Sequence, residues 1–348
     1  MSSEVLHFEA AINPYGCSPK VVEAIESCAR AKDYRFYGDA DARGLREQLA
    51  AHHGLSPDNF VIYNGAGEAL AWLFILNLLV PRGKLIVPHP SYERFVEAGR
   101  RCAAEVIEVP LNEENFSPSV DRMIEAANQK QANVGLISSP NNPTGNLLLD
   151  EIALDRLLNE APRCLWIVDE AYADYPGVSF VPRVCERRNL VVLRTFSKIY
   201  GLAGLRVGCA IAHADTARAL AQTRLPWCVN SLSLVAAEAA LADQDYIKET
   251  RALIHEDCRR LESALGSISY LSVYPSAANF FLVECRGVDA SRLKAHLASH
   301  KIQIRSCPDM PRHLRITSLL PEQNDFLIDV LAAYDPTQAE AKMEKAAS

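Results

Sequence analysis

The stretch TFSKIYGLAGLRVG, residues 195–208, holds a single lysine, Lys198, in an apolar segment broken by glycines. A lysine amine that loses its proton in such surroundings becomes a nucleophile toward carbonyl groups. Hydroxyl side chains flank it, and Arg206 follows eight residues later as a permanent cation. The segment therefore combines a candidate nucleophile with a candidate anion ligand.

A carboxylate, Asp169, ends the apolar run in WIVDEAYADY, residues 166–175, and Tyr172 follows it. Burying a carboxylate without a cationic partner costs free energy. The position therefore indicates a positively charged ligand, a helix N-cap or an ion pair in the core. The three interpretations stay open on this segment alone.

Two further segments place turn-forming residues after predicted strands. IYNGAGEAL, residues 62–70, is typical of a strand, a glycine-rich turn and a helix start, whose backbone N–H groups near Ala66 and Gly67 suit a phosphate. SSPNNPTGN, residues 138–146, contains Asn142. Both segments are equally typical of turns that only reverse the chain.

The elements that must position these residues alternate along the chain. Short runs rich in β-branched residues, from NFVIY at 59–63 to RVGCAIA at 206–212, are separated by segments of helical spacing. This alternation predicts an α/β fold, with a mostly parallel sheet flanked by helices on both faces. The four segments above each fall where a strand meets its following loop, which is where such sheets gather ligands.

A change of pattern near residue 230 predicts a second domain. Two long helical segments are followed there by four short strand-like runs, which indicate a smaller α+β domain. We expect a large ligand-binding domain over 36–229 and a small domain over 1–35 and 230–335. The polar tail over 336–348 lacks an apolar face and is expected to be frayed.

Composition and charge argue against several classes of partner. The 348 residues carry a formal charge of -7 with no basic tract, so nucleic acid and membrane surfaces are poor partners. Apolar stretches reach about 11 residues, against the roughly 20 that cross a bilayer, and the N-terminus does not look like a signal peptide. The ten cysteines have no paired spacing. We interpret them as reduced thiols of a cytoplasmic protein, with a disulfide framework or a zinc site as alternatives, and predict no metal site.

Together, the four segments describe a binding site for pyridoxal phosphate. In their order the chain resembles the class I/II aminotransferases, which are pyridoxal-phosphate enzymes of the aspartate aminotransferase fold type. The ordered motifs are NGxxE, PSY, NNPTG, DEAY, SKxxGLxGLRxG, PWxVN and a late LRI. The resemblance runs from residues 13–16 to 321–325. Within the family, the chain is similar to the branch of histidinol-phosphate aminotransferases and threonine-phosphate decarboxylases.

The resemblance implies roles for the residues that match these motifs. Lys198 would form a Schiff base with the cofactor pyridoxal 5'-phosphate and transfer protons. Asp169 would pair with the ring nitrogen, and Tyr92 would stack on the ring face as the third catalytic residue. The residues expected around the cofactor are Ala66, Gly67, Tyr92, Asn142, Asp169, Tyr172, Thr195, Ser197, Lys198 and Arg206, together with Tyr37 from a second subunit of a homodimer.

Substrate residues are expected at the later motifs. Arg315, in HLRITS, matches the family's late substrate arginine, and Arg305, in QIRSC, is a candidate for a second anion. Either arginine can instead be a solvated residue at a strand edge. Asn142 and Tyr15, the latter in the NPYG motif, complete the predicted substrate set.

We therefore predict a pyridoxal-phosphate-dependent aminotransferase that acts on a small amino acid or amino-phosphate and is similar to histidinol-phosphate aminotransferases. The alternatives are a decarboxylase resembling threonine-phosphate decarboxylase, a lyase or cyclase of specialised metabolism with the same Schiff-base chemistry, and a non-catalytic regulator. The intact lysine, aspartate and arginine set disfavours the regulator. Compared with the decarboxylases, the chain has Gly67 where they commonly have threonine and lacks their N-terminal HGG segment.

Overall fold

The computed structural model describes residues 5–78, 83–102 and 104–335. The strands in this part are β1 (Leu6–His7), β2 (Phe60–Tyr63), β3 (Lys84–His89), β4 (Glu105–Pro110), β5 (Val134–Ser138), β6 (Leu165–Asp169), β7 (Leu190–Thr195), β8 (Gly208–Ala212), β9 (Leu271–Val273), β10 (Phe280–Cys285), β11 (Ile302–Gln303), β12 (Arg305–Ser306) and β13 (His313–Thr317). The helices are α1 (Pro19–Ala31), α2 (Arg43–His53), α3 (Ala66–Leu78), α4 (Glu93–Arg101), α5 (Val120–Lys130), α6 (Glu151–Glu160), α7 (Ala214–Thr223), α8 (Ser231–Ala242), α9 (Gln244–Gly266), α10 (Ala290–Ser299) and α11 (Pro321–Ala332).

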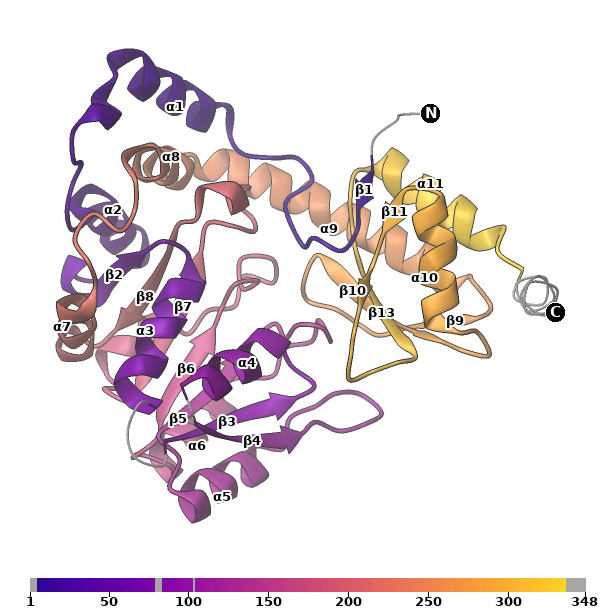
Figure 1. Cartoon of the computed structure of the whole chain (residues 1–348), viewed down its shortest axis with the longest axis horizontal. Helices are drawn as coiled ribbons and strands as arrows, with labels where there is room; N and C mark the ends of the chain where they lie inside the picture. The colour runs from indigo at the N-terminus through magenta and orange to yellow at the C-terminus, as the bar shows by residue number, and fades with distance from the viewer. Residues whose placement is uncertain (1–4, 79–82, 103, 336–348) are drawn as a thin grey trace.

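The largest sheet in the described residues has seven strands in the order β2-β8-β7-β6-β5-β3-β4. Strands β4, β3, β5, β6 and β7 pair in parallel, whereas β8 is antiparallel to both of its neighbours. The predicted α/β fold with a mostly parallel sheet is therefore confirmed. Figure 1 shows this sheet enclosed by helices, with the C-terminal elements beside it.

Apolar side chains cover both faces of the large sheet. Every residue of β5 and β8 is buried. Ile167 and Val168 are neighbours on β6, yet they belong to different hydrophobic clusters. Successive side chains of a strand point to opposite faces, so these two clusters are the cores on the two sides of the sheet.

Side-chain caps set several helix starts at the positions that the sequence indicates. Ser18 accepts a hydrogen bond from the Lys20 backbone N–H at 3.1 Å, and Pro19 occupies the first turn of α1. Asn230 caps α8 in the same way, through the Ser233 N–H at 2.9 Å. One of the four strand-like runs expected after residue 230, KIQIRSC at 301–307, is not a single strand. It is divided into β11, which pairs with β1, and β12, which pairs with β13.

A further hydrophobic core lies against the four-stranded sheet β12-β13-β10-β9 of the described C-terminal part. Helix α9 runs from beside α8 to the C-terminal elements, as Figure 1 shows. Ile254 of α9 is buried in the core of the large sheet, and Leu261 is buried in the C-terminal core. The buried apolar residues of α8 also belong to the core of the large sheet. The division at residue 230 stays a prediction, and the predicted tail over 336–348 lies outside the described residues.

Candidate active site

The predicted site residues converge at one edge of the large sheet. Strands β2, β3, β5, β6 and β7 all end at this edge, and the antiparallel β8 begins there. A cavity of about 910 Å³ opens at this edge and extends to the C-terminal sheet. The predicted residues that line it are Ala66, Gly67, Tyr92, Asn142, Asp169, Tyr172, Thr195, Ser197, Lys198, Arg206, Arg305 and Arg315.

Lys198 follows β7 by three residues and presents its amine to this cavity. Its Nζ lies 5.1 Å from the centroid of the Tyr172 ring, close enough for a cation–π contact. Among the described residues, Lys198 has no hydrogen-bond or ion-pair partner for this amine. The geometry thus leaves a nucleophilic group available to a ligand.

Asp169 is the last residue of β6, and its Oδ1 accepts a hydrogen bond from the Ala171 backbone N–H at 3.0 Å. Burial raises the pKa of this carboxyl group from 3.8 to about 6, against the opposing effects of the Ala171 hydrogen bond and the Lys198 charge. In the described structure, no cation lies within ion-pair distance of it. A cationic ligand group would therefore favour its ionised form.

Arg206 and the hydroxyls before Lys198 form the anion-binding end of the cavity. Arg206 Nη1 donates to Ser197 Oγ at 3.3 Å, and Thr195 Oγ1 donates to the same oxygen at 3.0 Å. The N-terminus of α3 faces the same cavity through Ala66 and Gly67. Gly65, before this helix, has φ +87°, and a Cβ there would lie 2.6 Å from Arg206 Nη2. A side chain at this position would therefore be strained by the positive φ and would displace the guanidinium from where it lies.

Arg315 lies on β13 at the opposite end of the cavity and is only 3% exposed. Its Nη1 donates to Asn142 Oδ1 at 2.8 Å, and its Nη2 donates to the Glu9 carbonyl oxygen. Because a guanidinium only donates, this bond fixes the Asn142 amide with Nδ2 free to donate to a ligand. Arg315 has no carboxylate partner among the described residues, and its buried Nε is without a hydrogen bond. Burial lowers the pKa of the Arg315 guanidinium.

Arg305 lies on β12 directly opposite Arg315 in the strand register. Unlike Arg315, it has a carboxylate partner, since its Nη2 contacts Glu93 Oε1. Its guanidinium carbon also lies 5.8 Å from the centroid of the Tyr92 ring. Glu93 was not among the residues predicted from sequence. Its place at the start of a helix is typical of an acidic residue that the helix dipole stabilises, but nothing in the sequence indicates that its partner is Arg305.

Two predicted residues do not line the cavity. Tyr15 donates from its hydroxyl to Asp257 Oδ2 on α9 at 2.6 Å, so its proposed contact with substrate stays a prediction. Tyr37 is 85% exposed and its ring contacts that of Trp227, with 5.0 Å between ring centroids. Its predicted role requires a second subunit and stays a prediction as well.

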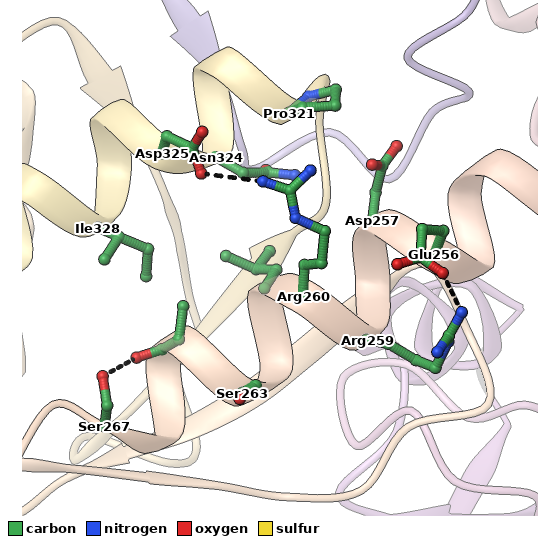
Figure 2. Close-up of a pocket in the computed structure, with 12 residues that line it drawn as sticks. Glu256, Asp257, Arg259, Arg260, Ser263, Ser267, Pro321, Asn324, Asp325 and Ile328 are labelled. Carbon is green, nitrogen blue, oxygen red and sulfur yellow. Dashed lines mark hydrogen bonds and ion pairs between the residues drawn. The ribbon is translucent and has the colours of Figure 1, made fainter.

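A second cavity, of about 550 Å³, lies between α9 and α11 and shares no lining residue with the first. Figure 2 shows Arg260 pointing toward Asp325, at 3.6 Å, and Arg259 paired with Glu256. The charges of these ion pairs neutralise one another, so the second cavity offers a ligand fewer unpaired charged groups than the first cavity does.

In the described part of the chain there is no group of three or more metal-ligating side chains, and no described helix is long and apolar enough to cross a membrane.

Comparison with known proteins identifies the family. The sequence model described as aminotransferase class I and II matches residues 3–331, nearly the whole chain. The chain belongs to the class I and II aminotransferase family. The family predicted from the ordered motifs is thereby confirmed, and this family member is an aminotransferase enzyme that acts on small amino substrates.

Relatives of this aminotransferase come from the predicted branch. A histidinol-phosphate aminotransferase of Roseiflexus castenholzii is 36% identical over 334 residues, covering 94% of this chain and 89% of the relative. The crystal structure of histidinol-phosphate aminotransferase from Sinorhizobium meliloti in complex with pyridoxal-5'-phosphate is 28% identical, with a TM-score of 0.83 and coverage of 96% and 90%. The L-threonine-O-3-phosphate decarboxylase of Porphyromonas gingivalis is 25% identical, with a TM-score of 0.81 and coverage of 93% and 97%.

Proposed function

We propose that this aminotransferase holds pyridoxal phosphate in the cavity at the edge of the large sheet. Three observations support the fit: an amine without a partner at Lys198, a half-buried carboxylate without a cation at Asp169, and a phosphate cradle made by Arg206, Ser197 and the start of α3. The position of Gly65, where a Cβ would strike Arg206, fits the same cradle. Tyr92 lines the cavity and would cover one face of the ring.

Each residue then has a distinct task. Pyridoxal phosphate supplies an aldehyde that condenses with amines and a ring that accepts the electrons of a bond broken at the substrate α-carbon. Lys198 would hold the aldehyde in the resting enzyme, and its amine, once released, would move the proton at the substrate α-carbon. Asp169, as a carboxylate, would keep the ring nitrogen protonated. Asn142 would donate from Nδ2 to the ring oxygen, while its Oδ1 accepts the hydrogen bond from Arg315.

We further propose that the amino donor is histidinol phosphate or a closely related amino-phosphate. The relatives that share a third of their sequence with nearly the whole chain carry this activity in their names. The buried and unpaired Arg315 supports the proposal, because a cation held ready at the end of the cavity suits an anionic substrate group. This cation is the observation on which the substrate class rests.

The test is a direct one. Protein loaded with pyridoxal phosphate is mixed with histidinol phosphate and 2-oxoglutarate, and the products are identified by mass spectrometry. We expect the keto product and glutamate, whereas Lys198→Ala should lose both the visible absorption of the bound cofactor and turnover. Release of carbon dioxide from phosphothreonine without transfer of its amino group would instead identify a decarboxylase. An active Lys198→Ala protein would refute the assignment of the lysine.

The proposal also includes a cytoplasmic homodimer. Large hydrophobic side chains are exposed in two neighbouring segments, at Tyr34, Phe36, Tyr37, Leu225 and Trp227. Trp227 Nε1 donates to the Gly38 carbonyl oxygen at 2.9 Å, so the two segments form one surface. An exposed apolar patch of this kind suits a second copy of the chain. The ten free cysteines suit a reducing compartment.

A further inference from the structure

The two arginines at the substrate end of the cavity differ in their electrostatic state. Arg305 and Arg315 are direct partners in the antiparallel register of β12 and β13, so they lie side by side on the same face. Two like charges in this position repel each other unless one is neutralised. Glu93 neutralises Arg305 through an ion pair, whereas Arg315 is bound only by neutral oxygens.

The ion pair of Glu93 and Arg305 joins two separate parts of the molecule. Glu93 begins α4, which packs on the large sheet through Phe95, and Arg305 follows Ile304, which is buried in the C-terminal core. The side chains of Glu93 and Arg305 are 30% and 31% exposed. A pair that water reaches to this extent is weak, so a ligand can break it.

Glu93 stays stabilised when it loses this partner. It occupies the first turn of α4, where the helix dipole favours a negative charge. Its partial exposure also allows water to solvate the carboxylate. Breaking the pair therefore releases Arg305 without leaving an uncompensated buried charge, in contrast with a fully buried ion pair.

We propose that Glu93 is a specificity-determining residue that holds Arg305 until a substrate brings a second anionic group. A substrate with one anionic group would bind Arg315 and leave the ion pair closed. A substrate with two would place the second group on Arg305 and displace Glu93. An aminotransferase binds its amino donor and its keto acceptor in turn at one site, so this exchange would let the site accept partners of different charge. The inference rests on the proposed function in placing the substrate, and the cofactor whose absorption reports its binding, in this cavity.

The test compares two probes of equal carbon number, succinate and butyrate, which differ by one carboxylate and lack the amino group needed for turnover. Each probe is titrated into cofactor-loaded protein, and its dissociation constant is read from the change in cofactor absorption. In Glu93→Gln, succinate no longer competes with a carboxylate for Arg305. The ratio of the butyrate to the succinate dissociation constant should rise about fivefold, the value of a partly exposed ion pair.

Three further variants decide whether Glu93 acts through Arg305. In Arg305→Gln the preference for succinate should disappear, and adding Glu93→Gln to it should have no further effect on the ratio. Glu97→Gln is the matched control, because Glu97 lies one turn later on α4 and pairs instead with Arg94 at 2.7 Å. In Glu97→Gln the ratio of the butyrate to the succinate dissociation constant should stay that of the wild type.

An unchanged ratio in Glu93→Gln would overturn the proposal, and so would an equal rise in Glu97→Gln or an effect of Glu93→Gln that persists without Arg305. Because neither probe turns over, these results do not depend on the amino donor. A protein inactive toward histidinol phosphate that still shows the expected ratios would contradict the proposed function and leave the role of Glu93 intact.

Discussion

Arg194, on β7, forms an ion pair with Glu170, the residue after Asp169, with 3.1 Å between Nη1 and Oε2. Arg194 also pairs with Asp174, and Glu170 accepts hydrogen bonds from Ser179 Oγ and the Phe180 N–H. The pair therefore ties the strand that leads to Lys198 to the segment that contains Asp169 and Tyr172.

Removing the charge of Glu170 should destabilise the protein and disturb the cofactor site together. Glu170 is 1% exposed and Arg194 12%, so Glu170→Gln leaves a mostly buried guanidinium with one carboxylate fewer, at a cost of about 3 kcal/mol in the free energy of unfolding. Urea unfolding measures this loss, and cofactor absorption reports the site. The control is Asp155→Asn, in the more exposed network around Arg183, where the cost should be below about 1 kcal/mol. Equal losses in the free energy of unfolding for the two variants would contradict a larger contribution from the pair of Glu170 and Arg194.

Asp169 makes the stability of the cofactor-free protein depend on pH. Its pKa is about 6 in the folded protein, against 3.8 without burial, so between these values the folded state binds a proton that the unfolded state does not. The contribution of Asp169 to stability is therefore complete below about pH 4 and is lost as the pH rises through 6. Cofactor-free Asp169→Asn should be more stable than the wild type at pH 7 and equal to it near pH 4. If the urea midpoints of the variant and the wild type instead change in parallel between pH 4 and pH 7, Asp169 is not the group that makes stability depend on pH.

Although Asp169→Asn should be more stable than the wild type without cofactor, it should bind pyridoxal phosphate more weakly. The proposed pairing of Asp169 with the ring nitrogen requires the carboxylate, so the wild-type protein should bind pyridoxal phosphate more weakly below pH 6. Asp169→Asn should bind it weakly at every pH. A cofactor affinity in the variant that equals that of the wild type at pH 8 would exclude the pairing.

The two glycines near the start of α3 should respond differently to alanine. Gly65→Ala forces a Cβ to within 2.6 Å of Arg206 Nη2 and places a side chain at φ +87°, a backbone strain of about 1–2 kcal/mol. The guanidinium must move, so the affinity for pyridoxal phosphate should fall at least tenfold. Gly67→Ala keeps its backbone N–H and adds a methyl group with nothing within 4 Å, so its affinity should stay near that of the wild type. Equilibrium titration with cofactor measures both constants.

Mixed dimers can test whether Tyr37 serves a neighbouring subunit. Tyr37→Ala and Lys198→Ala proteins are each expected to be impaired. A dimer with one subunit of each kind would contain one complete site if Tyr37 reaches across the interface. Random mixing of the two should then restore about a quarter of the wild-type specific activity. No recovery after verified subunit exchange would place the effect of Tyr37 within its own subunit.

The strands and the cavity residues were predictable because they depend on local pattern. Two of the short β-rich runs between 59 and 212, CLWIVDE at 164–170 and NLVVLRT at 189–195, contain β6 and β7, and the strand bounds lie within one residue of the ends of these runs. Asp169 is the last residue of β6 and Lys198 follows the end of its parallel neighbour β7, so the sheet brings them together. A sequence pattern carries this information, because side-chain alternation and turn composition are local properties.

Contacts between distant segments were not predictable in the same way. Glu93 and Arg305 lie 212 residues apart, and either one alone is typical of an exposed charge. Tyr15 belongs to a motif, yet its hydroxyl bonds Asp257 rather than lining the cavity. The sequence also carries no signal of the antiparallel direction of β8, because an entirely buried strand is apolar whichever way it runs. Such features depend on how the cores pack against each other.

Helix α9 is one continuous element of 23 residues, and its buried side chains pack in both the core of the large sheet and the C-terminal core. Ile254 packs with the large sheet, Leu261 packs with the C-terminal sheet, and Cys258 between them contacts both clusters. Loss of either core would strip apolar contacts from half of a helix whose other half is still held. Each core therefore raises the free energy needed to open the other, which makes the two parts a single cooperative unit in unfolding.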